Sequence, residues 1–326
     1  MIYKILNALI VVFVGVVGVP VLYFALNALV NRIPGRLRTW LRPYVFVGPA
    51  LAMVGVFLVY PAVHTVILSF RDRFGQEWVG FSNYVDVATD ASMREVVFNN
   101  ILWIVFVPTL TVAIGLAVAV LADRLKTTAE RVVKSVIFLP MAISFVGAST
   151  IWLFVYAYRP SGEQIGLLNA VWTLFGGEQQ AWTQLSAGNL NDFLLMVIMI
   201  WLQAGFAMVL LSAAIKNVPV ETLEAARIDG CNEWQIFWQV IVPQVRATIL
   251  VVLTTVTIFV LKIFDVVYVM TGGNFRTDIV ANRFITELLS ARNFGAAAVI
   301  VVALLMVTVP VMVLNIRRFR EEEATR

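Results

Sequence analysis

The feature of this sequence that most constrains its fold is a series of long apolar stretches. A helix needs about 20 apolar residues to cross the hydrocarbon core of a bilayer, and seven stretches reach that length. Soluble domains are about 45–50% apolar, whereas this chain of 326 residues is 60% apolar and 13% charged. We therefore predict an all-α integral membrane protein with about seven transmembrane helices. The predicted spans are Ile2–Val30, Tyr44–Phe70, Val96–Ala122, Ser135–Tyr158, Phe193–Ile215, Ala247–Met270 and Gly295–Ile316.

The spans and their flanking charges predict three parts of the chain. Residues 1–43 form an N-terminal transmembrane helix with a basic cytoplasmic linker, residues 44–316 form a six-helix core, and residues 317–326 form a cytoplasmic tail. The first apolar run is longer than the 7–15 residues of a secretory signal and has no Ala-x-Ala-like end. We expect this helix to be retained.

Lysine and arginine are distributed unevenly between the predicted loops. Residues 31–43, 123–134, 216–246 and the tail together carry 15 of them, and the opposite side carries 8. The richer side is cytoplasmic by the positive-inside rule. This distribution predicts an external N-terminus and a cytoplasmic C-terminus.

Several kinds of function are excluded by composition. The single cysteine, Cys231, and the single histidine, His64, cannot form a disulfide or a cysteine–histidine metal cluster. No Gly-x-x-x-x-Gly-Lys-Ser/Thr loop is present for binding nucleotide phosphates. The net charge is only +4, and basic residues gather at helix ends, so no nucleic-acid partner is expected. We predict no catalytic residue, metal or cofactor on this chain.

The cytoplasmic loop 216–246 is longer than its neighbours and contains two short amphipathic patterns. Pro219 is suited to a first helical turn, and Gly230 supplies a break or a left-handed turn. Trp234, Phe237 and Val240 then recur at helical spacing. Such a loop either presents a shaped surface to a partner or lies at the membrane interface. Periodicity alone favours neither interpretation.

The loop contains Glu224-Ala225-Ala226, Asp229-Gly230, Phe237 and Val240-Ile241-Val242-Pro243. These residues resemble the EAA motif of permease subunits in bacterial ATP-binding-cassette importers. The family often has a further proline soon afterwards, where this chain has Ala247. The resemblance implies that the loop docks into a cleft on an ATPase, with Glu224, Ala225, Ala226, Asp229, Gly230, Phe237 and Pro243 as the coupling residues. An ordinary surface helix is the simpler alternative.

Other segments resemble the maltose-type sugar permeases of the same family. They are Tyr60-Pro61, Ser69-Phe70, the run 78–84 (Trp-Val-Gly-Phe-Ser-Asn-Tyr), Leu139-Pro140 and the run 264–273 (Phe-Asp-Val-Val-Tyr-Val-Met-Thr-Gly-Gly). The resemblance covers about Leu41 to Phe319 and is closest to the larger, first permease of the maltose and α-glucoside branch.

The resemblance also implies a location and partners. They are the bacterial inner membrane, a second permease in a heterodimer, two ATPase subunits that bind ATP and Mg²⁺, and an external solute-binding protein. An α-glucoside or maltose-like oligosaccharide is the implied cargo, and a sugar alcohol or glycerol phosphate is the alternative.

Two charged residues lie within a predicted span. Lys262 and Asp265 are three apart, so they can meet on one helix face. Ionisable groups at membrane depth usually pair or face a cavity. An intramembrane ion pair is the simpler interpretation, and a pair that lines or gates the outer end of a path is the alternative.

Aromatic and amide side chains on the central spans are candidates for contact with a sugar. Sugars stack their CH faces on aromatic rings, and their hydroxyls need hydrogen-bond partners. The candidate residues of the substrate path are Asn100, Trp103, Ser149, Trp152, Tyr156, Trp201, Gln203 and Met208. For each residue, helix packing or an interfacial aromatic belt is the simpler interpretation.

Two other classes of function predict different sequence features. A secondary transporter would show inverted repeats, broken helices with midplane carboxylates and no loop for docking a partner. A membrane-embedded enzyme would show a cluster of nucleophile or acid–base residues. The sequence shows only the Lys262/Asp265 pair, without a convincing repeat or such a cluster, and the loop 216–246 favours the importer permease.

Overall fold

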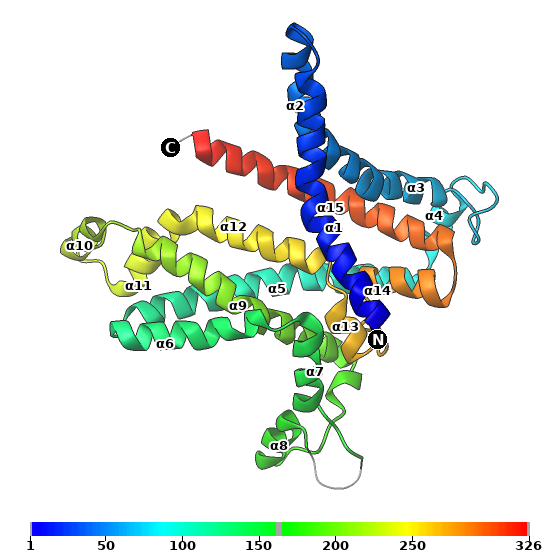
Figure 1. Cartoon of the computed structure of the whole chain (residues 1–326). Coiled ribbons are helices and arrows are strands. Elements are labelled where there is room, and N and C mark those ends of the chain that lie inside the picture. The colour runs from blue at the N-terminus through cyan, green and yellow to red at the C-terminus, as the bar shows by residue number, and fades with distance from the viewer. Residues whose placement is uncertain (1, 161–164, 325–326) are drawn as a thin grey trace. The chain divides into compact units, whose positions relative to one another are not determined.

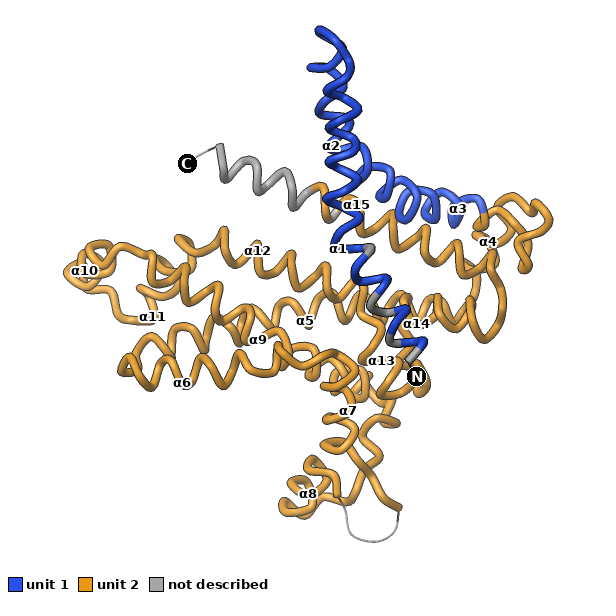
Figure 2. The backbone as a smooth tube through the Cα atoms, in the orientation of Figure 1, with its two compact units in different colours: residues 1–67 blue, residues 68–326 orange. Residues whose placement is uncertain are grey.

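The computed structural model describes residues 2–160 and 165–324, and nearly all the regular structure among them is helical. One isolated antiparallel bridge joins Arg71 to Trp78. The chain divides into two compact units, residues 1–67 and residues 68–326, which Figure 2 colours separately. Pro43, where the first predicted part ends, lies inside the helix Arg36–Val54.

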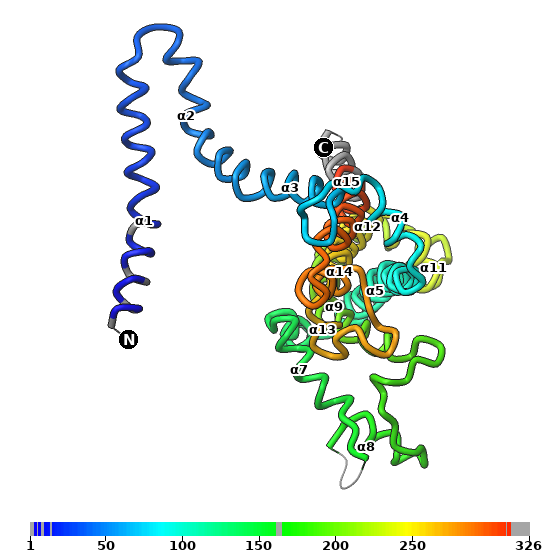
Figure 3. The backbone as a smooth tube through the Cα atoms, turned by 90° about the vertical axis from the view of Figure 1, so that its right-hand side faces the viewer, coloured from blue at the N-terminus to red at the C-terminus, as the bar shows by residue number. Residues whose placement is uncertain are grey.

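The first unit is built from long apolar helices. It contains α1 (Ile2–Asn31), α2 (Arg36–Val54), the π-helical turn η1 (Gly55–Val59) and most of α3 (Tyr60–Leu68). Figure 3 shows α1 and α2 joined by a tight turn, in which Gly35 has φ 73° and ψ −151°, a region open essentially to glycine alone. No residue of α2 is buried. Exposed apolar helices of this length are suited to contact with lipid.

The second unit holds the remaining helices (Figure 1). They are α4 (Ser82–Thr89), α5 (Ala91–Asp123), α6 (Thr127–Phe138), η2 (Leu139–Ala142), α7 (Phe145–Val155), α8 (Leu167–Leu174), η3 (Trp182–Gln184), η4 (Ala187–Asn189), α9 (Leu190–Lys216), α10 (Val220–Ile228), α11 (Glu233–Gln235), η5 (Ile236–Ile241), α12 (Val242–Leu261), α13 (Asp265–Met270), α14 (Val280–Ile285), η6 (Thr286–Ser290) and α15 (Phe294–Ala324).

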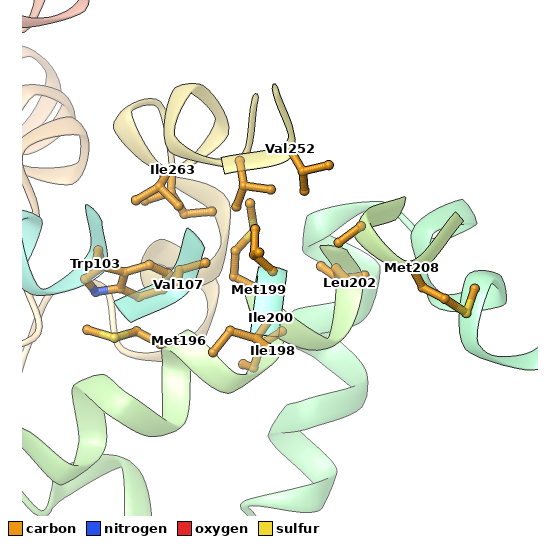
Figure 4. Packing of buried hydrophobic residues seen from close by; sticks show 14 of the residues in the cluster. Trp103, Val107, Met196, Ile198, Met199, Ile200, Leu202, Met208, Val252 and Ile263 are labelled. Carbon is orange, nitrogen blue, oxygen red and sulfur yellow. The ribbon is translucent and has the colours of Figure 1, made fainter. Parts of the chain in front are cut away.

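The core of this unit lies where α5, α9 and α12 pack together, and Figure 4 shows part of it. Small residues allow close approach of two of these helices. A Cβ at Gly115 of α5 would lie 2.6 Å from the Cβ of Ala207 on α9, so no larger residue fits at either position without movement. Small residues at helix interfaces are typical of membrane proteins, because they let the backbones come close.

The structure has fewer uninterrupted spans than the seven predicted. In the described part of the chain, five helices are long and apolar enough to cross a membrane, or six if one bent pair counts as a single span. That pair is the predicted span Ser135–Tyr158, which bends by 104° between Thr127–Ala142 and Phe145–Val155. The last predicted span lies within α15, of which the described residues include the apolar run Phe294–Pro310. The all-α membrane class is confirmed, and the count of seven is not.

Candidate functional site

The loop 216–246 forms two short helices joined by a left-handed turn. Gly230 has φ 85°, a conformation that glycine adopts without the steric cost other residues pay. The Gly230 amide donates to the Arg227 carbonyl at 3.1 Å, and the Cys231 amide donates to the Ala226 carbonyl at 3.0 Å. These bonds close the end of α10 as glycine-terminated helices usually close. Pro219 lies directly before the helix as its N-cap.

The second helix of the loop begins with a reciprocal cap. The Asn232 side chain accepts from the Gln235 amide at 2.9 Å, and the Gln235 side chain accepts from the Asn232 amide at 2.9 Å. Arg227 Nε lies 3.1 Å from Glu233 Oε1, which links α10 to α11 across the turn. The angle between the two helices is therefore fixed by Gly230, by the cap and by one exposed ion pair.

Most of α10 faces away from the rest of the chain. Val220 is 60% exposed and Ile228 is 85% exposed, and Glu224 and Ala225 are also exposed. Ala226 is buried within this chain, so only Ala225 of the alanine pair is free to approach a partner. Apolar side chains this exposed on a short helix are suited to contact with a partner or with the membrane interface.

Aromatic residues extend this surface onto α11 and η5. Trp234 is 70% exposed and Trp238 is 50% exposed. Phe237 lies beneath them, with its ring centroid 4.9 Å from that of Trp238. These three side chains and the end of α5 line an apolar cavity of about 530 Å³. Pro243 is exposed in the first turn of α12.

A network of charges that sequence reasoning missed lies at the base of the loop. Lys216 Nζ lies 2.5 Å from Glu130 Oε1 and 3.6 Å from Asp123 Oδ1, and Lys134 Nζ is also 2.5 Å from Glu130. The network ties the ends of α5, α6 and α9 together. The spacing of Glu130 and Lys134 was a visible signal, but Lys216 is distant in the sequence and only the fold brings it near.

The candidates for the substrate path fall into two groups. Trp103, Ser149 and Met208 are fully buried. Trp103 Nε1 donates to Asp192 Oδ1 at 2.9 Å, and the Ser149 hydroxyl donates to the Phe145 carbonyl at 2.8 Å. Packing within this chain accounts for the burial of all three and for the two hydrogen bonds, and their place on the substrate path stays a prediction.

The second group is an aromatic cluster on α7 and α9. The Trp152 ring lies 5.0 Å from Tyr156 and 5.8 Å from Trp201 between centroids. Trp152 and Trp201 are half-buried, whereas Tyr156 is buried and donates from its hydroxyl to the Leu194 carbonyl at 3.0 Å. Trp152 and Tyr156 line a cavity of about 310 Å³. Gln203 is 4% exposed, and its Oε1 has no hydrogen-bond partner among the described residues.

The predicted ion pair of Lys262 and Asp265 requires correction. Helix α12 ends at Leu261 and α13 begins at Asp265, so the two residues do not lie on one continuous helix. None of the ion pairs in the described part of the chain joins them. The three-residue spacing places two side chains together only where the helix is continuous, and Phe264 at φ −137° interrupts it.

The segment 271–279 that follows α13 is held by buried asparagines. Asn99 Nδ2 donates to the carbonyls of Arg276 and Asp278 at 2.7 and 2.9 Å. Asn191 Nδ2 donates to the Phe275 carbonyl at 2.7 Å. The Asn100 side chain accepts from the Val280 amide at 2.7 Å. Asn100, a candidate for the substrate path, therefore holds the backbone at Val280, directly after this segment.

Charged side chains line a cavity of about 320 Å³ beside the same segment. Arg276 Nε lies 2.9 Å from Glu95 Oε1, and Arg283 Nε lies 3.1 Å from Asp278 Oδ2. Burial raises the pKa of Asp278, while the Asn282 hydrogen bond and Arg283 act in the opposite direction. Sequence reasoning missed this cluster, because its members come from separate segments.

Comparisons with known proteins agree on one family. Residues 111–319 match the model described as "Binding-protein-dependent transport system inner membrane component". The chain is 52% identical over 283 residues to the osmoprotective compounds uptake permease protein GgtC of Synechocystis sp., covering 86% of this chain and 100% of that protein. It is 48% identical over 289 residues to the alpha-glucoside transport system permease protein AglF of Rhizobium meliloti, covering 88% of this chain and 85% of that protein.

The fold also resembles a solved structure. It matches a chain of a bacterial ABC transporter involved in the import of the acidic polysaccharide alginate, with a TM-score of 0.74 and 18% sequence identity. The match covers 88% of this chain and 99% of that chain. At this identity the likeness concerns the fold alone.

Proposed function

The chain belongs to the inner membrane components of binding-protein-dependent transport systems, and from that membership we propose that it forms half of the translocation path for a carbohydrate. An α-glucoside or maltose-like oligosaccharide is the proposed cargo, which the name of the Rhizobium meliloti relative supports. A sugar alcohol or glycerol phosphate is the second candidate. The ATP-hydrolysing subunits are separate chains.

The observation that carries the proposal is the exposed α10. A chain without a phosphate-binding loop must receive work through contact with its ATPase. Val220, Glu224 and Ile228 are exposed on a short helix whose angle depends on the left-handed Gly230. We place the ATPase on this surface. A second permease in a heterodimer and an external solute-binding protein complete the proposed assembly.

Uptake by reconstituted vesicles tests the proposal. The permease is assembled with its second permease, ATPase and binding protein, and entry of a labelled α-glucoside is measured with and without ATP. We expect uptake that requires ATP and every partner. Uptake driven by an ion gradient without the ATPase would instead indicate a secondary transporter. A labelled sugar alcohol, compared at equal concentration, distinguishes the two classes of cargo.

The path for the sugar is proposed to pass the aromatic cluster on α7 and α9. Trp152 and Trp201 are half-buried at this surface, and aromatic rings stack on sugar CH faces. Trp152→Ala is expected to weaken uptake several-fold or alter sugar preference while the complex still assembles. Trp172→Ala, which removes a half-exposed indole from α8, is the control. Equal uptake by wild type and Trp152→Ala would place the sugar on the partner permease.

The orientation is proposed from the loop charges, with the N-terminus outside and the C-terminus in the cytoplasm. Accessible cysteines can test it in a Cys231→Ser background. Ile228→Cys in α10 is expected to resist an impermeant thiol reagent in intact cells, and Glu178→Cys, exposed on the other side of the predicted membrane, is expected to react. The reverse pattern would invert the assignment.

A further inference from the structure

The turn between α1 and α2 carries a concentrated positive charge that the transport function does not use. Arg32, Arg38 and Arg42 line a cavity of about 500 Å³ together with the backbone of the turn. Arg36 lies beside it in the first turn of α2. Four arginines therefore fall within eleven residues of chain at the meeting point of two membrane helices.

These arginines have no counter-charge nearby in the chain. The sequence contains no Asp or Glu before Asp72, and none of the ion pairs in the described residues involves them. All four side chains are exposed. Elsewhere in the protein, basic residues such as Lys216 and Arg283 face carboxylates. The positive charge of the turn is therefore available to an anion that is not part of this chain.

The geometry of α2 directs the arginines toward the same place. Arg38 and Arg42 are four residues apart, so they share one helix face. Side chains on a helix lean toward its N-terminus, which for α2 is the turn itself. Gly35, in a backbone region essentially restricted to glycine, lets the chain reverse tightly enough to keep Arg32 at the same cavity.

The limits of the two neighbouring candidate spans place the turn at the level of the lipid headgroups. The candidate span of the first helix ends at Asn31, and the next candidate span begins at Arg36. Trp40 and Tyr44 are both more than half exposed, and their rings lie 5.1 Å apart. Tryptophan and tyrosine are enriched at the membrane interface, at the level of the headgroups. Lipid phosphates are consequently the anions that the turn meets at highest local concentration.

We propose that the α1–α2 turn, residues 31–42, is a binding site for the headgroup of an anionic phospholipid. Guanidinium groups bind phosphate oxygens through paired hydrogen bonds, and basic pockets at the ends of membrane helices suit lipid headgroups that carry two phosphates. The flanking aromatic rings hold the turn at headgroup depth, and the exposed apolar faces of α1 and α2 contact the acyl chains.

Lipid retention by the purified complex in detergent tests the proposal. Native mass spectrometry measures binding of cardiolipin, with phosphatidylcholine as the neutral comparison. We expect selective retention of cardiolipin, and about tenfold or greater loss of affinity in the variant Arg32→Gln/Arg38→Gln/Arg42→Gln, since each basic group near the surface contributes several-fold. The matched control, Lys126→Gln/Arg131→Gln/Arg246→Gln, removes three exposed cytoplasmic-loop charges outside the cavity and is expected to bind normally.

A second variant separates charge from folding. Removal of three arginines can also disturb insertion, whereas Arg32→Lys/Arg38→Lys/Arg42→Lys keeps the charge and is expected to retain cardiolipin. Loss of equal size in the control variant, or wild-type retention by the glutamine variant, would overturn the proposal. Displacement of cardiolipin by millimolar inorganic phosphate would also overturn it, because the turn would then be a site for soluble anions. The readout is lipid binding, so it is independent of the transport assay.

Discussion

The helix α10 and the segment 271–279 lie on either side of α12 in the sequence, and they are held in opposite ways. After α12, the buried amide side chains of Asn99 and Asn191 bond to the backbone of the segment 271–279, and buried Asn100 bonds to the Val280 amide directly after it. Before α12, the helix α10 exposes most of its side chains, and one exposed ion pair links it to α11. The segment 271–279 is complete within this chain, whereas α10 leaves much of its surface uncovered.

With α10 as the proposed ATPase surface, this difference separates what the chain folds alone from what it would present to a partner. A buried amide that lost its carbonyl would cost the full desolvation penalty, so the segment 271–279 has one favourable arrangement. Exposed Val220 and Ile228 gain nothing in the isolated chain and gain burial only when a partner covers them. Variants at the two sites should therefore affect different measurements: folding stability at 271–279 and coupling at α10.

The largest effect is expected at Gly230. A β-branched residue in the left-handed conformation costs about 1–2 kcal/mol or more, and a Cβ there would meet nothing within 4 Å. Gly230→Val should therefore alter the angle of α10 without disturbing packing. We expect transport and substrate-stimulated ATP hydrolysis to fall together by at least about tenfold, with the membrane helices still inserted.

Gly176→Val is the matched control for Gly230→Val. Gly176 has φ 83°, close to the 85° of Gly230, and also has open space around its Cβ position. It lies in the segment after α8 instead of the proposed ATPase surface, so the same backbone strain should leave coupling intact. Wild-type transport and hydrolysis in Gly230→Val, at normal expression, would mean that the loop is not the coupling element.

The sequence predicts the features of these two segments that depend on residues close together in the chain. It does not predict those that depend on residues far apart. The turn at Gly230 and the amphipathic α10 depend on neighbours within a few residues, so periodicity and a glycine reveal them. Asn99 and Asn191 act on carbonyls far away in the sequence, and no local pattern predicts the partner. The pairing of Lys262 with Asp265 was wrong for the related reason that local spacing assumed an unbroken helix.

The span count illustrates the same limit. Hydropathy detected every apolar stretch, because it measures composition within a window. It did not detect the bend of 104° after Ala142, which depends on how Leu139-Pro140 ends one helix and Ser144 caps the next. Tertiary packing determines which side of each helix is buried, so the sequence alone could not show that Trp103 and Met208 are buried within this chain.

The second effect is expected at Glu224 of α10. Glu224 is exposed, and none of the ion pairs found among the described residues includes it, so Glu224→Ala should not alter the stability of the permease alone. Against a partner charge, its loss costs from close to nothing in an exposed contact to about 2–5 kcal/mol in a buried one. We expect weaker stimulation of ATP hydrolysis and an unchanged melting temperature. Glu178→Ala, a charge removed on the other side of the predicted membrane, should change neither measurement.

The third effect is expected at Asn99, which holds the segment 271–279. Asn99→Ala leaves the carbonyls of Arg276 and Asp278 without their donor inside the protein, and an unpaired buried group costs about 1–3 kcal/mol. We expect a lower melting temperature of the purified permease. Asn274→Ala removes an exposed side chain that bonds only locally, to the Thr271 carbonyl at 2.8 Å, and should cost less. Equal melting temperatures for Asn99→Ala and wild type would mean that the segment is not held as the structure indicates.

The smallest effect is expected at two helix N-caps, Asp90 of α5 and Asn232 of α11. Asp90 caps α5 by accepting from the Ser92 amide at 2.8 Å and the Ser92 hydroxyl at 2.7 Å, whereas Asn232 caps α11 with a neutral side chain. Replacement of either cap by alanine should cost about 0.5–2 kcal/mol near neutral pH. The hydrogen bonds from Ser92 lower the pKa of Asp90, assisted by Arg283 and Arg94.

The two caps should differ in their response to acid. A carboxyl group whose pKa is lowered by folding stabilises the protein above its unfolded pKa of about 3.9, and this contribution is lost as the pH falls through the folded pKa. The difference in melting temperature between wild type and Asp90→Ala should therefore shrink between pH 6 and pH 3. Asn232 does not ionise, so the difference for Asn232→Ala should stay constant over the same range. A difference for Asp90→Ala that does not change with pH would mean that the carboxylate form is not what caps α5, and the cap would then act through its backbone geometry alone.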